Sequence, residues 1–322
     1  MQGNHNRDFT ILAPRAAAAE ITRHLQEGGP MSFIRLGDGE GLVLSLCEES
    51  SFDDLHHLST HFGGPGVSLG NVFRLRDEMI AAATHADIVG VRDDVVGVRH
   101  DPELFDLGPG LFEREFKRRF PLRTCDAGLP ANACRRLALL NRVLETMHFP
   151  ASTLFTSAWT HWDLAASGQL YRWIGKQQRI GLITSRANLP ALLEDLLQVE
   201  VKSYFVPDMY KDSLPKISGA HFPNRYEELR SELSVDYPGM LFLVGAGICG
   251  KIYCRWIKDR GGVALDIGAV LDTWTGIGSR PAVFRDRFGN ADFTGDVPSD
   301  LLLNRKNVQR LLTHSESTLL SQ

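Results

Sequence analysis

The sequence predicts an α/β fold with a mostly parallel sheet flanked by helices, and three stretches indicate it. Residues 179–206 alternate a strand, a helix and a second strand with short links, which is typical of a β-α-β unit. Residues 240–266 repeat that order, with an apolar strand, a glycine-rich turn, a helix and a strand that ends at Asp266. A third apolar run, Phe33-Ile34, leads into a turn of glycines and carboxylates. Polar residues that follow strands in such a fold gather at one edge of the sheet.

The other elements follow from apolar spacing and from proline and glycine positions. A proline at its start and the pair Ile21 and Leu25 predict a helix over 14–26, which Gly28 ends. The run 42–46 fits a helix or a strand, and after residue 298 we expect a short helix at best. Further helices are expected at 73–84, 131–147, 188–198, 226–233 and 251–258, and further strands at 87–91, 153–156 and 263–265.

Composition favours one globular domain. The chain has 322 residues, 43% of them hydrophobic and 23% charged, and shows no repeat or low-complexity linker. We therefore expect a single domain over 1–322 with its core at about 30–290. A net charge of -4 argues against a dedicated nucleic-acid binder, which usually carries a basic excess. The oligomeric state stays open.

The cysteines and the apolar runs indicate a cytoplasmic protein. The five cysteines are dispersed and none forms a C-x-x-C pair, as expected for reduced thiols. The N-terminal residues are polar, without the apolar segment of a signal peptide. The longest apolar run, 240–250, is too short to span a bilayer, so we expect no transmembrane segment. Peripheral attachment to an inner membrane remains an option.

The turn Arg35-Leu36-Gly37-Asp38-Gly39-Glu40 is the first candidate site. Asp38 and Glu40 are two residues apart and would face the same side of an extended chain. Two such carboxylates repel each other unless a cation lies between them, and a divalent ion that also binds phosphate is the usual solution. Arg35 would then hold an anionic substrate. The alternative is an ordinary surface turn.

The run Gly245-x-Gly247-x-x-Gly250 is the second candidate. It follows a strand, opens a helix and precedes Asp266 at the end of the next strand, which is the context of a dinucleotide-binding fingerprint. It therefore indicates an NAD(P)-dependent oxidoreductase. Its late position argues against this function, because the fingerprint usually lies on the first strand of its fold. A nucleotide-sugar transferase would use both glycine motifs.

Other strand ends carry further candidates. Ser185 and Arg186 lie between a strand and a helix, where phosphate binds readily. His161 follows a strand near two tryptophans, so it is either part of a site or a buried core imidazole. His57 and His61 are four residues apart and could bind a metal, although a solvated helix face is the more common explanation.

These residues together resemble the glycosyltransferases of the GT-D fold. The segment 35–40 is similar to the R-F-G-D-G-E segment of that family, whose D-x-E pair binds metal. The resemblance runs in the same order over roughly residues 30–275. The other segments that are similar to the family are Gly64-Pro65-Gly66-Val67, Ser185-Arg186, Gly245-Ala246-Gly247 and Ala264-Leu265-Asp266-Ile267-Gly268. Two positions depart from the family pattern: Ala269 stands where the family has histidine, and Ala187 where it has proline.

The resemblance implies a Rossmann-like α/β domain of GT-D type and a metal-dependent glycosyltransferase. Its donor would be a nucleotide-diphosphate sugar such as a UDP-sugar, and its acceptor a hydroxyl of a glycan, glycolipid or glycoprotein. Asp38 and Glu40 would hold Mn²⁺ or Mg²⁺. We expect the donor at Arg35, Gly37, Gly39, Ser185, Arg186, Gly245 and Gly247. Asp266, Asp272 and His161 compete for the role of catalytic base. An NAD(P)-dependent oxidoreductase and a non-catalytic nucleotide-binding module remain the alternatives.

Overall fold

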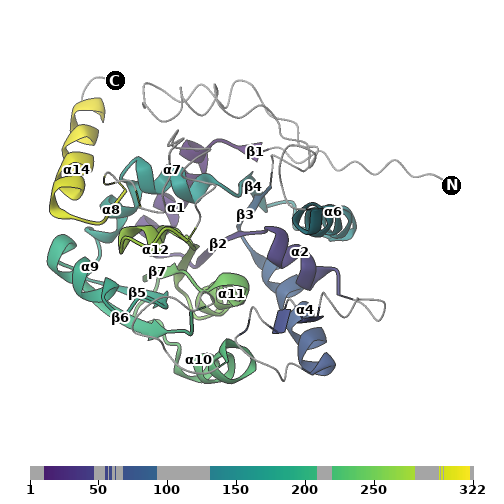
Figure 1. The fold of residues 1–322 in the computed structure, drawn as a ribbon. Coiled ribbons are helices and arrows are strands. Elements are labelled where there is room, and N and C mark those ends of the chain that lie inside the picture. Colours follow the sequence, from purple (N-terminus) through teal and green to yellow (C-terminus); the bar gives the residue numbers. More distant parts are fainter. Residues whose placement is uncertain are drawn as a thin grey trace.

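The structure is a computed structural model that describes residues 11–46, 55–56, 58–59, 62, 68–92, 131–208, 220–279, 297, 299 and 301–319. Its centre is a single eight-stranded sheet in the order β1-β4-β3-β2-β8-β7-β5-β6, in which every paired strand is parallel (Figure 1). The predicted α/β class with a parallel sheet is confirmed. The strands are β1 (Ile11–Leu12), β2 (Met31–Arg35), β3 (Ile88–Val91), β4 (Leu154–Ser157), β5 (Arg179–Thr184), β6 (Glu200–Phe205), β7 (Leu241–Val244) and β8 (Val263–Asp266).

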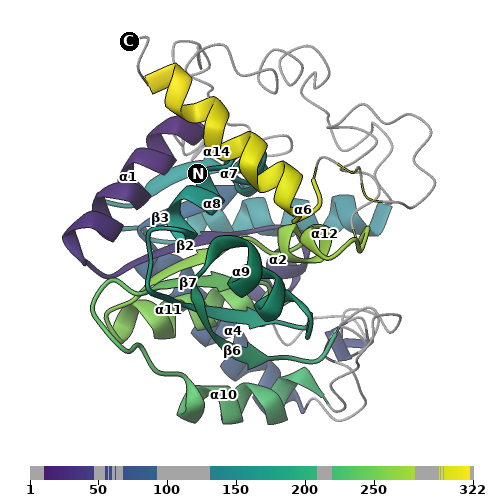
Figure 2. The same ribbon diagram turned by 90° about the vertical axis from the view of Figure 1, so that its left-hand side faces the viewer.

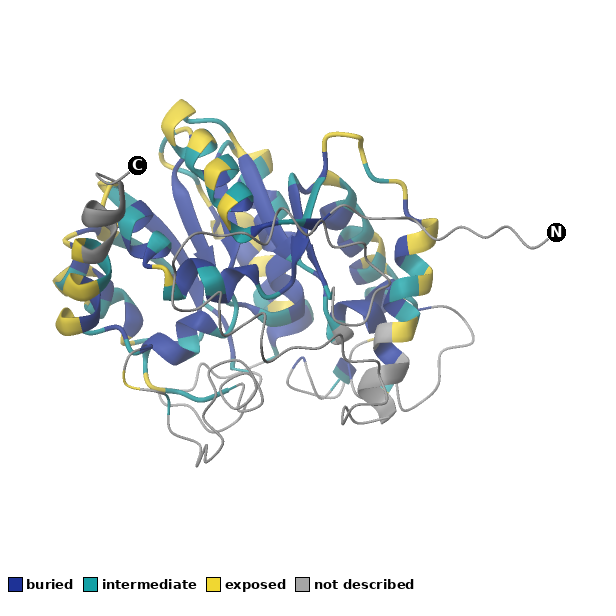
Figure 3. Cartoon of the chain, turned by 90° about the horizontal axis from the view of Figure 1, so that it is seen from above, coloured by how far each residue is buried: buried dark blue, intermediate teal, exposed yellow. Residues whose placement is uncertain are grey.

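Helices cover both faces of the sheet, and each face has its own apolar core. The central strands β3, β7 and β8 are buried along their whole length, as a parallel sheet covered on two sides requires. On one face lie α2 (Asp38–Leu44), α4 (Leu69–His85), α6 (Ala131–Thr146), α10 (Tyr226–Glu232) and α11 (Gly250–Asp259). On the other lie α1 (Pro14–Glu27), α7 (Thr160–Ala166), α8 (Gln169–Ile174), α9 (Leu189–Leu197), α12 (Val270–Trp274) and α14 (Arg305–Leu319). Figure 3 shows the buried sheet between helices whose outer sides are exposed.

The strand order brings distant parts of the chain together. The chain builds β2, β3 and β4 toward one edge of the sheet, crosses to β5 and β6 at the other edge, and returns through β7 to β8. β8 therefore pairs with β2, with Phe33 opposite Leu265. The acidic turn after β2 and the end of the glycine-motif unit become neighbours through this pairing.

Two expectations about individual elements change. The undecided run 42–46 belongs largely to helix α2. The C-terminal segment forms α14, a helix of 15 residues rather than a short one, and its Leu311 packs against Gly168 at the start of α8 (Figure 2). His57, His61 and the segment 64–67 lie outside the described residues. No helix in the described ranges is both long and apolar enough to cross a membrane.

Candidate functional site

The predicted site residues gather at the carboxyl edge of the sheet, around β2 and β8. The chain leaves β2 into α2 on one face and leaves β8 into α12 on the other. Neighbouring strands whose connections diverge in this way leave a crevice, and ligands of open α/β sheets bind there. This edge is the candidate site.

Arg35, the last residue of β2, is fixed on three sides. Its Nε donates to the backbone oxygen of Asp266 at 2.9 Å, and one terminal nitrogen donates to Oδ1 of Asp266 at 2.9 Å. The other terminal nitrogen lies close to both ring nitrogens of His161, 2.9 Å from Nε2 and 3.4 Å from Nδ1. The Arg35 side chain keeps 17% exposure, whereas Asp266 has 1%.

Two glycines make room for Arg35. A Cβ on Gly90 of β3 would lie 3.1 Å from Cγ of Arg35. A Cβ on Gly268, which follows β8, would lie 2.2 Å from a terminal nitrogen of Arg35. Gly268 also has φ +49°, in the left-handed region that favours glycine. The guanidinium therefore occupies a preformed cradle.

Lys251 joins the two sequence motifs. It lies in the first turn of α11, is almost fully buried, and its ammonium forms ion pairs with Oε1 of Glu40 at 2.7 Å and Oδ2 of Asp266 at 3.1 Å. Burial lowers the pKa of Lys251, but the carboxylates of Asp266 and Glu40 outweigh it and raise the pKa above its usual value. Burial likewise raises the pKa of Asp266, and Arg35 and Lys251 outweigh it and lower the pKa. Lys251 and Asp266 therefore both stay charged near neutral pH.

The acidic turn is a helix N-terminus and not an extended segment. Asp38 and Glu40 lie in the first turn of α2. The backbone N–H of Gly37 donates to Oε2 of Glu40 at 2.8 Å, and this hydrogen bond caps the start of the helix. From the sequence these two residues were considered on an extended chain, and the structure places both in a helix instead. The structure does not describe the side chain of Asp38.

The glycines of both motifs serve close packing. A Cβ on Gly39 would lie 3.3 Å from Ile248, which belongs to the second glycine motif. A Cβ on Gly245 would lie 2.7 Å from Leu271 and 3.1 Å from the backbone oxygen of Gly268. The two motifs thus contact each other and the segment after β8. Gly247, with φ +54°, starts the short turn that leads into α11.

Arg186 forms a second charged cluster farther along the same edge. Its Nε donates to Oδ1 of Asp272 and a terminal nitrogen donates to Oδ2 of Asp208, each at 2.7 Å. Ser279 donates to the other oxygen of Asp272 at 2.5 Å. Arg186 has 3% exposure, so both carboxylates hold it inside the protein. The neighbouring Ser185 is half-buried.

The structure thus sorts the predicted residues into two groups. Arg35, Glu40, Asp266 and His161 form one connected network with Lys251, whereas Arg186 and Asp272 form the second cluster with Asp208. Sequence reasoning missed Lys251 and Asp208. The available signals were that Lys251 directly follows Gly250 of the glycine motif, and that Asp208 comes just after a strand.

The three candidates for the base differ in access. Asp266 and His161 are each 1% exposed and contact Arg35. Asp272 keeps 17% side-chain exposure, although both of its oxygens accept hydrogen bonds. Among these three, Asp272 is the one that an acceptor can approach from solvent.

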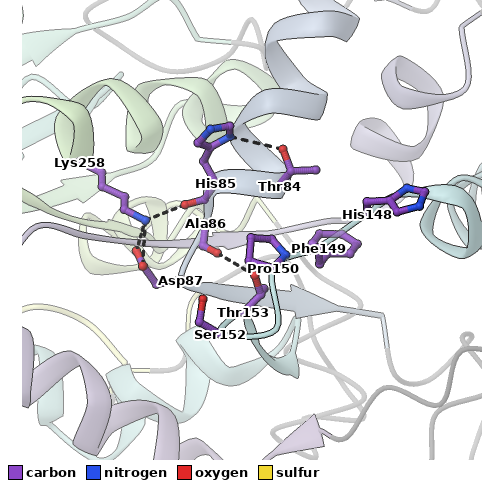
Figure 4. Close-up of a pocket in the computed structure, with 10 residues that line it drawn as sticks. All are labelled: Thr84, His85, Ala86, Asp87, His148, Phe149, Pro150, Ser152, Thr153 and Lys258. Atoms are coloured by element: carbon purple, nitrogen blue, oxygen red, sulfur yellow. Dashed lines mark hydrogen bonds and ion pairs between the residues drawn. The ribbon is translucent and has the colours of Figure 1, made fainter.

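A cavity lies at the opposite, amino-terminal edge of the sheet. Its lining includes His85, the last residue of α4, and Asp87 and Thr153, which directly precede β3 and β4 (Figure 4). Lys258 closes one side by donating to the backbone oxygen of His85 at 2.7 Å and to Asp87 at 2.8 Å. Asp87 also accepts from the backbone N–H of Ser32 at 2.8 Å. These charges hold helix ends to strands, away from the site at the carboxyl edge.

A family model points to the same family as the motifs. Residues 12–107 match the family model of the GT-D fold-like domain, which confirms the resemblance for the segment that contains Arg35–Glu40. No curated protein sequence matches the chain. One similar solved structure is the domain of unknown function 1792, described as a distinct glycosyltransferase fold: 12% identity, TM-score 0.44, with 81% of this chain and 78% of that chain covered. Another is a glycosyltransferase of that domain family from Streptococcus sanguinis: 15% identity, TM-score 0.46, with 83% and 85% covered.

Proposed function

We propose that the chain is a glycosyltransferase that moves a sugar from a nucleoside diphosphate sugar, such as a UDP-sugar, to a hydroxyl of a glycan, glycolipid or glycoprotein. The observation that carries this proposal is the fixed guanidinium of Arg35 at the carboxyl edge. It lies inside the segment that matches the GT-D fold-like domain.

Arg35 suits the diphosphate of such a donor. Of the five N–H groups of a guanidinium, three bind Asp266 and His161, which leaves two for a ligand. A guanidinium held in one orientation binds phosphate oxygens with little loss of entropy. In the transfer step it stabilises the negative charge that develops on the departing nucleoside diphosphate.

Metal dependence, predicted at Asp38 and Glu40, fits this arrangement only in part. One oxygen of Glu40 contacts the ammonium of Lys251 and the other accepts from the backbone of Gly37. Glu40 therefore does not fit as a metal ligand in this arrangement. A divalent cation held by Asp38 stays a prediction, and such an ion would add positive charge beside the leaving diphosphate.

Asp272 is the proposed base that takes the proton of the acceptor hydroxyl. The proposal rests on its exposure and on its place after β8, at the same edge of the sheet as Arg35. Arg186 and Ser279 orient its carboxylate through hydrogen bonds. A base has to reach the proton that it removes, and the buried Asp266 and His161 do not offer that access.

The structure argues against the oxidoreductase alternative, because Asp266 is not accessible to a cofactor. In a dinucleotide fold the acid after the glycine motif binds the ribose hydroxyls. Asp266 is 1% exposed and ion-paired with Arg35 and Lys251, so a ribose cannot reach its carboxylate. A non-catalytic nucleotide-binding module uses the same edge of the sheet and is separated from the transferase only by an activity assay.

A thermal-shift panel separates these functions. UDP, two UDP-sugars, NAD and NADP are added to the full chain with Mn²⁺ or with a chelator, and release of sugar from the donors is then measured. We expect UDP and UDP-sugars to raise the melting temperature. We expect Arg35→Lys, which keeps the charge opposite Asp266 but removes the planar fork, to reduce this shift. Arg23→Lys on the exposed side of α1 is the matched control.

Each outcome of the panel has a clear meaning. Stabilisation by NAD or NADP but not by UDP contradicts the proposal and favours the oxidoreductase. Stabilisation by UDP without any hydrolysis or transfer, across a set of glycan acceptors, favours the binding module. An Arg35→Lys variant that folds and keeps the full UDP shift removes Arg35 from the donor site.

A further inference from the structure

We propose that Lys251 is the resident cation of this site, and that its ammonium occupies the place beside Glu40 that the D-x-E pattern assigns to a divalent metal. Glu40 is thus the counter-ion of a lysine and not a metal ligand. The inference concerns the charge of the unliganded site, so it holds whether or not the protein transfers sugar.

The surroundings of the Lys251 ammonium are those of a bound cation. Three oxygens from three different segments surround Nζ: Oε1 of Glu40 at 2.7 Å, Oδ2 of Asp266 at 3.1 Å and the backbone oxygen of Gly247 at 3.1 Å. Carboxylate and backbone oxygens are also the ligands that hard metal ions prefer. Here an amino group of the chain itself uses them.

Among the side chains that the structure describes at this site, the charges of the ion-paired network balance. Glu40 and Asp266 contribute two negative charges, and Arg35 and Lys251 contribute two positive ones. Buried charges are stabilised by such pairing, and an added divalent ion would leave this buried cluster with an excess of positive charge. Carboxylates that await a metal lack cationic partners, whereas both of these carboxylates have them.

Burial and the packing of α11 also fix the position of the Lys251 side chain. The residue is 4% exposed, and the helix that carries it packs through Ile252, Tyr253 and Cys254 into the core. A metal at Glu40 would have to displace the ammonium, and the described surroundings offer this buried side chain no solvent to move into. Asp266 would also lose one of its two cationic partners.

Mn²⁺ binding to the full-length protein tests the assignment, with electron paramagnetic resonance reporting the free ion. The titration is done without nucleotide and again with saturating UDP, on wild type and on Glu40→Gln, which keeps the size of the side chain. We expect the two proteins to have the same Mn²⁺ affinity within about twofold, including the case in which neither binds. A loss of roughly tenfold or more in a folded Glu40→Gln variant overturns the proposal.

A second variant tests the place of the cation directly. Lys251→Met removes the ammonium and leaves Glu40 and Asp266 without it, so we expect this variant to gain a Mn²⁺ site. The double variant Lys251→Met/Glu40→Gln should not gain it. A folded Lys251→Met protein that binds Mn²⁺ no better than wild type overturns the claim that Lys251 fills the metal position. If Lys251→Met does not fold, the comparison of wild type with Glu40→Gln decides alone.

Discussion

Arg35 can bind an anion only while its neighbours leave it space, which makes Gly268 a sensitive position. Gly268→Ala adds a Cβ that would lie 2.2 Å from the guanidinium. We expect the variant to lose UDP affinity on the order of tenfold, because a hydrogen bond to a charged group contributes roughly 1.5–3 kcal/mol. Isothermal titration with UDP measures the loss.

Gly261→Ala is the control for Gly268→Ala. Gly261 also has a positive φ, +92°, so alanine strains the backbone there by a comparable amount, roughly 1–2 kcal/mol. Nothing lies within 4 Å of the added Cβ, and the position is far from Arg35 in the turn before β8. Equal UDP affinities of the two variants would remove the clash with Arg35 as the cause.

His161 contacts a terminal nitrogen of Arg35 through both of its ring nitrogens, which makes it a positioning residue. His161→Gln supplies another acceptor, whereas His161→Ala supplies none. We expect His161→Gln to keep UDP affinity within about threefold of wild type and His161→Ala to lose roughly tenfold. Activity at saturating donor should then be restored in His161→Ala. If both variants lose all turnover while binding UDP normally, His161 has a chemical role instead.

At the scale of single residues, the sequence located the site better than it described the contacts. Arg35 and Asp266 were found because glycine motifs at strand ends mark a sheet edge. Lys251 was missed because a lysine in the first turn of a helix ordinarily faces solvent. Only the pairing of β2 with β8 brings Glu40, from the N-terminal part of the chain, to Lys251 and Asp266.

At the scale of elements, helix α2 shows why its glycines are needed. A Cβ on Gly41 would lie 2.6 Å from a backbone oxygen of α6 and 2.7 Å from Leu140. We expect Gly41→Ala to destabilise the protein by roughly 1–3 kcal/mol, the usual cost of overpacking, even though alanine is the better helix former. Urea denaturation followed by circular dichroism measures it.

Gly70→Ala in helix α4 is the matched control for Gly41→Ala. Nothing lies within 4 Å of a Cβ at this exposed position. Alanine should therefore stabilise the helix by roughly 0.5–1 kcal/mol. The two substitutions are chemically identical and should have opposite signs. A stabilising Gly41→Ala would mean that α2 and α6 do not pack this closely in solution.

The sequence predicted most elements, and its failures have physical causes. Long periodic segments such as α6 and strand-turn-helix units such as β7 to α11 were recognised because local pattern determines them. The choice between helix and strand for the run 42–46 stayed open because five residues carry too little periodicity. The hydrogen bond from Gly37 to Glu40 caps a helix that includes most of this run. Helix α14 was underestimated because tertiary contacts with α8, through Leu311, stabilise a segment with a polar sequence.

At the scale of the whole molecule, the charged network joins the two faces of the sheet. Lys251 and Glu40 belong to helices on one face, whereas His161 belongs to a helix on the other. Asp266 and Arg35 connect them across the carboxyl edge. Strand pairing, two apolar cores and this network together fix how β2 and β8 present the candidate site. Loss of charge at this edge should therefore affect global stability.

The pH dependence of unfolding follows from the two shifted groups. The pKa of Asp266 in the folded protein lies below its ordinary value of 3.8, so its contribution is complete above about pH 4 and is lost as the pH falls through the lowered pKa. The pKa of Lys251 lies above 10.5, so its contribution is complete below that value and is lost as the pH rises through the raised pKa. The network should therefore stabilise the fold between roughly pH 4 and pH 10.

Asp266→Asn tests the acid side of this window. The variant should be less stable than wild type at pH 7, since Arg35 and Lys251 each lose a carboxylate partner. Its stability should also fall less steeply between pH 5 and pH 3, because one proton-linked group is gone. Denaturant titrations across this range give both quantities. Asp77→Asn on exposed α4 is the control and should keep the wild-type stability at pH 7. An Asp266→Asn protein with the wild-type acid slope would mean that Asp266 does not keep its charge through pairing with Arg35 and Lys251.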